Sequence, residues 1–398
     1  MYNLVKHNLE KIFMNFIFLS PHFPPNYKRF CLNLKQAGAT VLGLGDTSYD
    51  LLDHDLKYSL TEYYRVSDLH QYDELLRACG YLTHRYGKID RIDSLNEYWL
   101  ETEARLRTDF NIAGIKNDTI HSIKYKSRMK EIFRQAGIPV ARGQVLHTYA
   151  EAEKMIPEYT FPLVAKPDKG VGALSTFKIN SLEELRSVFE KKAPVDYIFE
   201  EFVPGSIYTF DGLTNQHGRL IFYTSHTYSQ GVMETVNDES DIYYYSLRDI
   251  PARLEDYGKK CIQAFDVRER FFHFEFFHTP DDQYVGLEVN IRPPGGFTTD
   301  MFNYAFDSDI YRAWAEMIVH GKTELPFERK FHCCYVSRKH GKRYKYSHDE
   351  IIRRFGYLMV MDSEVPHVFR TALGDYCYIF RTHNPEQLFE VAHLIQEK

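Results

Sequence analysis

An acidic strand pair is the part of the sequence whose residue types and spacing point most directly to chemistry. Glu275 lies in one apolar run, a turn sequence of Pro and Asp follows, and Glu288 lies in the next apolar run. These features predict two antiparallel strands joined by a tight turn. With the turn centred on Asp281 and Asp282, Glu275 is expected directly opposite Glu288, on the same face of the pair.

The residues around Glu288 make this face a candidate metal site. Asn290 and Arg292 follow Glu288 at alternate positions and share its face, and Asn290 is expected opposite His273. Opposed carboxylates repel each other, and Mg²⁺ favours carboxylate oxygens together with substrate phosphates. We therefore weigh a magnesium site at Glu275, Glu288 and Asn290 against a merely solvated strand face. The opposite face is continuously apolar, which favours the metal site.

A lysine followed by a glycine-rich loop is a second candidate feature. Lys166 ends an apolar strand that starts at Leu163, and Lys169, Gly170 and Gly172 follow it. Glycines let backbone N–H groups approach phosphate oxygens, and a lysine at a strand end adds positive charge. The spacing is not that of a P-loop. Taken alone, a hairpin that contains glycines is the more common explanation.

Two further segments have both a structural and a functional interpretation. Glu200 and Glu201 end an apolar strand and lead through Phe202 and Val203 into a Pro-Gly turn. This segment is either a simple strand exit or a hinge whose backbone groups read an adenine edge. Lys126 lies on a helix predicted over 122–136, where an exposed lysine is usually only solvated.

In their order along the chain, these features resemble the ATP-grasp superfamily over nearly the whole length after Met14. Lys126 looks like the first ATP lysine, Lys166 like the second, and 168–175 like the flexible phosphate loop that closes to exclude water. The segment 200–203 looks like the adenine hinge. The nucleotide-binding residues that the resemblance implies are Lys126, Lys166, Lys169, Gly170, Gly172, Glu200, Glu201, Phe202 and Val203.

The resemblance also covers the strand pair. Glu275, Glu288 and Asn290 match the family's magnesium ligands, and Arg292 matches its anion-binding arginine. Lys166 and Arg292 are therefore the implied catalytic residues. The implied metal is Mg²⁺, with two ions bound and Mn²⁺ as a substitute.

One position departs from the family pattern. Many members carry an acidic residue a few positions past the hinge, which holds the ribose hydroxyls. This chain has Ser206-Ile207-Tyr208 at that place. Either Asp211 holds the ribose instead, or the alignment shifts there.

The resemblance implies an ATP-dependent ligase that joins a small carboxylate to an amine. The carboxylate attacks the γ-phosphate, and the amine then displaces phosphate from the acyl phosphate. Two other functions use the same scaffold: carboxylation through carboxyphosphate, for which a carrier could be a separate chain, and phosphoryl transfer by a kinase. A non-catalytic nucleotide-binding module is a third alternative, which the intact metal and arginine set argues against.

The predicted elements position these residues. In the N-terminal part of the chain the sequence pattern alternates between strands and helices, and further along it predicts mainly strands. The chain of 398 residues is long enough for two to three cores. The expected fold class is α/β: an ATP-grasp fold preceded by a Rossmann-like domain. The expected domains are the Rossmann-like domain at 14–120, the small ATP-grasp lobe at 121–205, the large catalytic lobe at 206–330, and a strand and helix region at 331–398.

Composition excludes several classes of protein. The net charge is −6 without a basic block, which argues against nucleic-acid binding. No apolar run reaches the ~20 residues of a membrane helix, and the six cysteines contain no Cys-x-x-Cys pair, so buried reduced thiols are expected. A cytoplasmic protein with no membrane partner is predicted. Residues 1–13 are interpreted as an extension, and a homodimer is one assembly that the sequence leaves open.

A few more polar residues have open interpretations. Glu97 could face the substrate, but a capping box with Ser94 is the favoured interpretation. His226, Tyr228 and the segment 229–241 could line the acceptor site, or the segment could be a surface loop. The basic cluster 338–343 could bind an acidic molecule, with a solvated turn as the default.

We expect Glu288→Ala to abolish ATP turnover and leave the fold intact, because Glu288 lies between both other metal positions on a polar face. ADP release with Mg²⁺-ATP and the circular dichroism spectrum measure the two properties. Near-normal ADP release from a well-folded variant would remove Glu288 from the mechanism.

Overall fold

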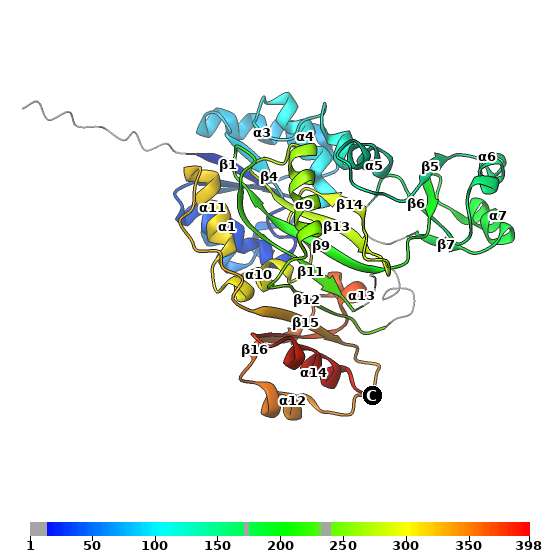
Figure 1. Cartoon of the computed structure of the whole chain (residues 1–398). Helices are drawn as coiled ribbons and strands as arrows, with labels where there is room; N and C mark the ends of the chain where they lie inside the picture. The colour runs from blue at the N-terminus through cyan, green and yellow to red at the C-terminus, as the bar shows by residue number, and fades with distance from the viewer. Residues whose placement is uncertain (1–13, 171–174, 230, 232–239) are drawn as a thin grey trace, which may run out of the picture. The chain divides into compact units, whose positions relative to one another are not determined.

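The computed structural model describes residues 14–170, 175–229, 231 and 240–398 (Figure 1). These residues divide into two compact units. The first contains 14–95, 99–117 and 311–323, and the second contains 96–98, 118–310 and 324–398. The expected boundaries at 120, 205 and 330 stay predictions.

The first unit is built on a parallel sheet with the strand order β3-β2-β1-β4. Its strands are β1 (Asn15–Leu19), β2 (Thr40–Gly45), β3 (Glu62–Arg65) and β4 (Arg91–Asp93). The helices of this part of the chain are η1 (Pro25–Tyr27), α1 (Lys28–Gln36), η2 (Tyr49–Leu51), α2 (His54–Ser59), α3 (Tyr72–Tyr86), η3 (Glu97–Trp99), α4 (Leu100–Asp109) and α11 (Ile310–His320).

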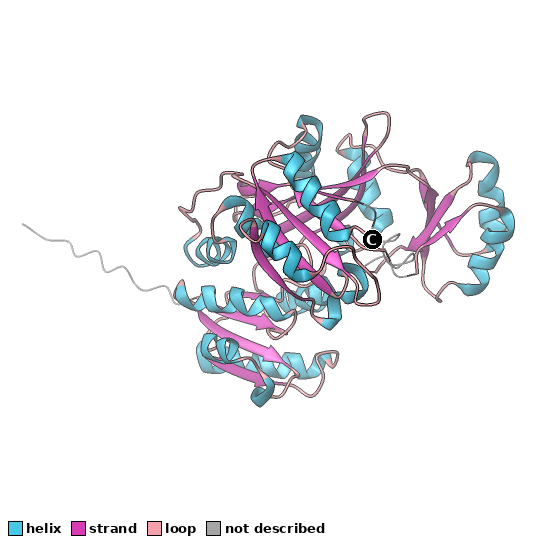
Figure 2. Ribbon diagram, turned by 90° about the horizontal axis from the view of Figure 1, so that it is seen from below, coloured by secondary structure: helices cyan, strands magenta, loops and turns pink. Residues whose placement is uncertain are grey.

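Helices cover both faces of this sheet, as Figure 2 shows. On one face, the ring of Phe16 in β1 packs against Trp314 of α11, with the ring centroids 5.7 Å apart. The next residue, Ile17, points to the other face and belongs to a core cluster that includes Leu75 and Cys79 of α3. Burial on both faces explains why β1 and β2 are almost continuously apolar. The prediction of a parallel sheet flanked by helices is confirmed.

The second unit contains a small antiparallel sheet with the order β5-β8-β6-β7. Its strands are β5 (Gly143–Leu146), β6 (Leu163–Pro167), β7 (Phe177–Ile179) and β8 (Tyr197–Glu201), and η4 (Ile120–Ile123) and α5 (Lys126–Gln135) precede it. The helices α6 (Tyr149–Met155), η5 (Ile156–Glu158) and α7 (Leu182–Lys191) accompany this sheet. A capping box of Thr148 and Glu151 begins α6.

A large sheet forms the rest of the second unit, with the order β14-β13-β9-β11-β12-β15-β17-β16 and β10 beside β9. Its strands are β9 (Ser206–Thr214), β10 (Leu220–Thr224), β11 (His226–Tyr228), β12 (Tyr243–Ser246), β13 (Phe271–His278), β14 (Tyr284–Asn290), β15 (His332–Arg338), β16 (Met359–Glu364) and β17 (Tyr376–Thr382). The helices are α9 (Ala252–Ala264), α10 (Thr298–Phe306), α12 (His348–Phe355), η6 (His367–Phe369), α13 (Arg370–Leu373) and α14 (Pro385–Gln396).

The pairing of β13 with β14 places the acidic residues as predicted. Glu275 pairs with Glu288, and His273 pairs with Asn290. The strands are antiparallel, so the two carboxylates start from neighbouring positions on one face of the large sheet.

The turn between these strands is not centred where the sequence predicts. Thr279 N–H donates to Gln283 O at 2.9 Å, so the loop is 280–282, with Asp282 at φ +59°. A loop of this kind alone would shift the pairing by one residue. A bulge between Glu275 and Phe276 reverses this shift, so that the predicted pairing holds from Glu275 onward, away from the turn. The predicted pairing is therefore right although the predicted turn is wrong.

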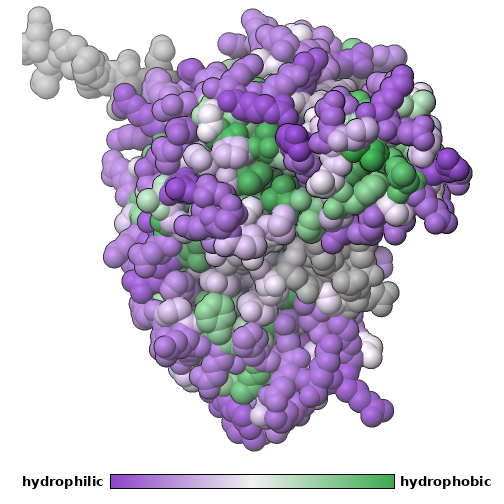
Figure 3. Space-filling model, turned by 45° about the vertical axis from the view of Figure 1, so that its right-hand side comes forward, coloured by the Kyte–Doolittle hydropathy of each residue, from purple (hydrophilic) through white to green (hydrophobic). Residues whose placement is uncertain are grey.

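The surface and the cysteines agree with the composition. The face drawn in Figure 3 is mostly hydrophilic. Among the described residues, no helix combines the length and the apolar character needed to cross a membrane. All six cysteines are free and buried, as expected.

The packing of α9 against β9 generates a stability prediction. A Cβ added at Gly258 of α9 would lie 2.1 Å from Phe210 Cδ1. We expect Gly258→Ala to lower the free energy of unfolding by about 1–3 kcal/mol, because overpacking outweighs the ~1 kcal/mol gain in helix propensity. Thermal unfolding measures the effect.

Gly80 of α3 provides the control, because a Cβ added there meets no heavy atom within 4 Å. Gly80→Ala should therefore raise the unfolding temperature or leave it unchanged. A Gly258→Ala variant as stable as the wild type would show that Phe210 moves aside without cost.

Candidate active site

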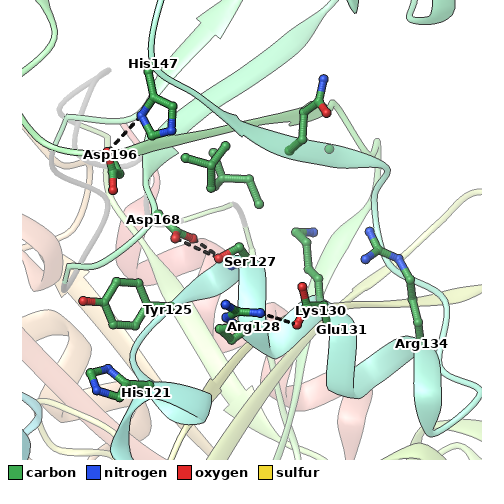
Figure 4. Close-up of a pocket in the computed structure, with 14 residues that line it drawn as sticks. His121, Tyr125, Ser127, Arg128, Lys130, Glu131, Arg134, His147, Asp168 and Asp196 are labelled. Atoms are coloured by element: carbon green, nitrogen blue, oxygen red, sulfur yellow. Dashed lines mark hydrogen bonds and ion pairs between the residues drawn. The ribbon is translucent and has the colours of Figure 1, made fainter.

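Helix α5 is held at both ends by the strands that carry the predicted site. At its start, Ser127 N–H and the Ser127 hydroxyl donate to the two Asp168 carboxylate oxygens at 2.7 and 2.8 Å (Figure 4). Asp168 thus satisfies a free N–H group of the first turn, and its negative charge suits the positive end of the helix. Beyond the helix, Gly286 N–H of β14 donates to Pro139 O at 2.7 Å. The sequence pointed to the loop that contains Asp168 but not to this capping role.

Two lysines and one glutamate form a buried cluster between α5 and the small sheet. The carboxylate of Glu200 accepts Lys166 Nζ at 2.6 Å and lies 2.8 Å from Lys130 Nζ. The three residues are 2 to 7% exposed. The sequence interpretation missed Lys130, although its spacing of four residues from Lys126 puts both on one face of the helix.

The pKa values in this cluster follow from burial and charge together. Burial would raise the pKa of Glu200, but Lys166 and Lys130 outweigh burial and hold it below its usual range. Burial would lower the pKa of Lys166, and Glu200 raises it above its usual value instead. Burial dominates at Lys130 and lowers its pKa despite Glu200. The cluster therefore keeps a charged lysine at the end of β6.

Lys126 connects α5 to the acidic strand pair. Its Nζ lies 3.2 Å from Glu288 Oε1 and 3.4 Å from Gly170 O. Glu288 in turn pairs with Glu275 across the strands. The structure thus brings together Lys126, Gly170, Glu275 and Glu288, which lie far apart in the sequence.

Glu275 is also tied to a buried network of histidines. His273 lies with Nε2 3.0 Å from Glu275 Oε1 and with Nδ1 2.6 Å from Asp211 Oδ1. The other Asp211 oxygen contacts Thr209 and lies 2.8 Å from His226 Nδ1. This network was not expected from the sequence, because its members become neighbours only across three strands.

The network sets the charges of its members. Burial would raise the pKa of Asp211, but His273 and His226 lower it to about 2. Burial would lower the pKa of His273, but Asp211 and Glu275 raise it to about 9. The pKa of Glu275 stays below its usual range because His273 and Arg292 outweigh burial.

This geometry bears on two earlier interpretations. Asp211 is fully buried and both of its oxygens already have partners, so a ribose contact would have to replace one of them. Its ribose role stays a prediction. His226 is also fully buried against Asp211, which argues for a structural role rather than for a place in the acceptor site.

Arg292 lies beside Glu97, which corrects the capping-box interpretation. Ser94 N–H donates to Glu103 Oε1 at 2.7 Å instead of to Glu97. Glu97 contacts Lys124 through Oε1 at 2.5 Å, and its Oε2 lies 3.5 Å from Arg292 Nε. Arg292 also donates to Asn290 Oδ1 at 3.4 Å. The functional interpretation of Glu97, given second place from the sequence, fits these contacts better.

The remaining predicted residues take varied positions. Glu201 contacts Arg142 at the surface, and Phe202 lies under Lys178 Nζ, 4.0 Å from the ring centroid. Val203 follows the end of β8, and Lys169 Nζ lies 5.8 Å from the Tyr125 ring centroid. Gly172 lies outside the described residues.

The strand pair suits a metal that is shared with a substrate. It offers two carboxylates and the amide oxygen of Asn290, and the described residues contain no cluster of three or more His, Cys, Asp or Glu side chains arranged for a metal. Mg²⁺ commonly takes one or two carboxylates and completes its shell with phosphate oxygens and water. The residues present therefore fit Mg²⁺ bound together with a phosphate compound.

A neighbouring cavity of about 680 Å³ lies between α5 and the strands of the small sheet. Figure 4 shows the residues that line it. Lys130 and Asp168 border it, and Arg128 and Glu131 pair on its rim at 2.9 Å. Asp168 begins the predicted phosphate loop 168–175, whereas none of the other described nucleotide or metal residues predicted from the sequence lines this cavity. The cavity therefore adjoins the buried lysine cluster at Lys130.

Comparison with known proteins shows what this architecture is similar to. No protein-family model matches the chain. An L-arginine-specific L-amino acid ligase of Bacillus subtilis is 26% identical over 254 residues, which cover 61% of this chain. The chain spans about 60% of the length of that curated relative.

Solved structures show the same fold over nearly the whole chain. The L-amino acid ligase of Bacillus licheniformis has a TM-score of 0.74 at 14% identity and covers 96% of both chains. N5-carboxyaminoimidazole synthetase of Staphylococcus aureus, in complex with ADP, has a TM-score of 0.67 at 14% identity, with 96% of this chain and 98% of that chain covered.

The His273 network predicts a pH dependence of stability. The pKa of His273 is about 9 in the fold and about 6.5 in an unfolded chain. Because the folded pKa is higher, the contribution is complete below about pH 6.5 and is lost as the pH rises through 9. Without divalent metal, we expect the free energy of unfolding to fall by about 3 kcal/mol more between pH 6.5 and 9.5 than in His273→Gln.

Urea unfolding at each pH measures this difference. The control is His278→Gln, because His278 lies in the same strand but contacts Asp282 at the surface. It should keep the wild-type pH dependence. The same slope in His273→Gln and in the wild type would show that the His273 charge does not stabilise the fold.

Proposed function

We propose that this chain, which belongs to the ATP-grasp superfamily, is an ATP- and Mg²⁺-dependent ligase that joins a small carboxylate to an amine. The observation that carries the proposal is the contact between Lys126 and Glu288. Glu288 lies opposite Glu275, and the buried cluster that contains Lys166 is close by. Cations for phosphate and carboxylates for a metal thus lie at one place. The likeness to L-amino acid ligases supports amino acids as the class of substrate.

ATP binding would exchange the partners of two groups. Lys126 now pairs with Glu288, so a phosphate that attracts Lys126 releases the glutamate. Glu275, Glu288 and Asn290 would then hold Mg²⁺, whose positive charge offsets the negative charge of the phosphates. Because each exchange favours the other, ATP and Mg²⁺ are expected to bind as one unit. Two ions, with Mn²⁺ as a substitute, are part of the proposal.

Lys166 would contribute a fixed positive charge to the same phosphates. Glu200 keeps it protonated and the buried cluster keeps it in place before ATP arrives. A donor that is already oriented stabilises developing charge without reorganisation. Glu201, Phe202 and Val203 would supply the hinge beside the adenine, and Lys169 and Gly170 would belong to the phosphate loop.

The reaction itself would proceed in two steps. A substrate carboxylate oxygen attacks the γ-phosphorus of ATP, the bond to the bridging oxygen breaks, and ADP leaves with that electron pair. The amine nitrogen then attacks the carbonyl carbon of the acyl phosphate, phosphate leaves with the C–O electron pair, and the nitrogen loses a proton. A free carboxylate does not react with an amine in this way, because it lacks a good leaving group.

Arg292 would stabilise the negative charge that both steps place near the acyl group. Its guanidinium lies beside Glu97 and donates to Asn290, so it is oriented toward the polar face of the strand pair. A planar guanidinium suits carboxylate and phosphate oxygens. The protein would thus contribute positioning and charge rather than a covalent step.

The test is a matrix of amino acids and small carboxylates incubated with the protein and Mg²⁺-ATP. We expect ADP and phosphate release only with particular pairs, together with a product whose mass is the sum of the pair minus water. Arg292→Met should lose this activity by at least about a hundredfold, while Arg343→Met, a surface arginine of the basic turn, should keep it.

Other outcomes would contradict the proposal. ADP formed with a single substrate and no amine would indicate a kinase or a carboxylase. ATP binding without turnover across the matrix would indicate a non-catalytic nucleotide-binding module.

A further inference from the structure

A second pocket lies in the C-terminal part of the large sheet, away from every residue assigned to the nucleotide or the metal. It has a volume of about 360 Å³ and is formed by the end of β15, the basic turn after it, the start of α12, and β17. This volume is within the usual range of ligand pockets. The lining contains the cations of Arg338, Lys339 and Lys342, and its other residues are Tyr or His. None of the described acidic residues lines it.

Arg338 makes this more than a solvated turn. The residue is 9% exposed, and its guanidinium lies over the Tyr344 ring, 4.4 Å from the centroid. Its Nε donates to Ile395 O at 2.6 Å, while Nη2 is buried and has no hydrogen-bond partner among the described residues. No carboxylate forms an ion pair with it in the described part of the chain. A buried cation without an anion is costly.

The two lysines add charge at the edge of the pocket. Lys339 Nζ contacts no carboxylate among the residues described. Lys342 Nζ lies 3.2 Å from Asp241 Oδ1. Asp241 is shared, because it also accepts the Tyr344 hydroxyl at 2.9 Å and lies 3.8 Å from Lys398. Asp241 is therefore shared by two lysines, of which only Lys342 lines the pocket.

Three further carboxylates, Asp362, Glu364 and Asp375, contact residues of the lining, and Asp375 accepts the His340 N–H at 3.0 Å. Asp362 accepts the Tyr376 hydroxyl at 2.7 Å. Glu364 lies 3.1 Å from both His340 and Arg370. In the described part of the chain, none of these three carboxylates forms an ion pair with Arg338, Lys339 or Lys342, and the aromatic rings of Tyr378 and His348 stack in the same pocket.

We propose that this pocket is a binding site for a compact anion with two or more negative charges, either a phosphate compound or an oligocarboxylate. Such an anion would give Arg338 the partner that the fold lacks, and a guanidinium can hold phosphate or carboxylate oxygens through two parallel hydrogen bonds. Lys339 and Lys342 would contact its remaining oxygens. The site is independent of the ligase proposal, because the two share no residue.

Isothermal titration calorimetry of the whole chain with inorganic pyrophosphate and, separately, with citrate tests the proposal. Both titrations are done without divalent metal, since both anions chelate it. Saturable binding of at least one anion is expected. Tighter pyrophosphate binding would assign the site to phosphate compounds, and tighter citrate binding would assign it to oligocarboxylates.

Variants locate the binding. Lys339→Ala should weaken it about tenfold or more, which corresponds to the loss of one charge-assisted contact. Arg343→Ala is the matched control, because Arg343 belongs to the same basic turn and carries the same charge but does not line the pocket. It should bind like the wild type. Arg338→Met should abolish binding, and its thermal unfolding shows whether it is folded.

Three results would overturn the proposal. The first is that neither anion binds saturably to the wild type. The second is that Lys339→Ala and Arg343→Ala weaken binding equally, which would mean that only the net charge matters. The third is that Lys339→Ala binds the anion like the wild type, which would place the anion elsewhere, such as at the lysines of the nucleotide site.

Discussion

Glu200 lies between two buried lysines, Lys130 and Lys166, and this ionic cluster joins α5 to the small sheet. Removing one member of a buried ion pair leaves an uncompensated charge, which typically costs about 3–5 kcal/mol. The contacts of Glu200 therefore hold α5 and β6 at a defined distance. Lys126 depends on this arrangement, because it begins the same helix one turn earlier and reaches Glu288 from there.

The carboxylates of the acidic strand pair also need positively charged partners. Glu275 and Glu288 start from opposed positions, and each has a positively charged partner, His273 for one and Lys126 for the other. The two partners differ in kind. His273 is fixed by Asp211, whereas Lys126 comes from a separate helix and would exchange Glu288 for a phosphate in the proposed mechanism. In the proposed mechanism, Glu275 would be a metal ligand that is held rigidly, and Glu288 would become available as a ligand when the substrate binds.

Part of this arrangement could be predicted from the order of residues in the sequence. The reasons why individual predictions succeeded or failed differ. The opposition of Glu275 and Glu288 follows from strand periodicity and a short turn, although a bulge corrects an error in the predicted turn. The position of His273 opposite Asn290 was predicted, but its contacts with Asp211 and Glu275 were missed, as was Lys130, because a strand histidine and a helix lysine have no local mark that separates them from solvated residues. The capping-box prediction for Glu97 failed because a capping box is a local pattern, and Glu103, in the following helix α4, contacts Ser94 instead.

The sequence by itself determined the elements, their order, and the chemical types available at each strand end. These depend on periodicity and turn residues, which act over a few positions. Only the tertiary structure decided which charges compensate each other: Glu200 with Lys130, Asp211 with two histidines, and Arg338 with no carboxylate in the described residues. The physical reason is that the cost of a buried charge depends on neighbours from distant segments, and no local pattern specifies those neighbours.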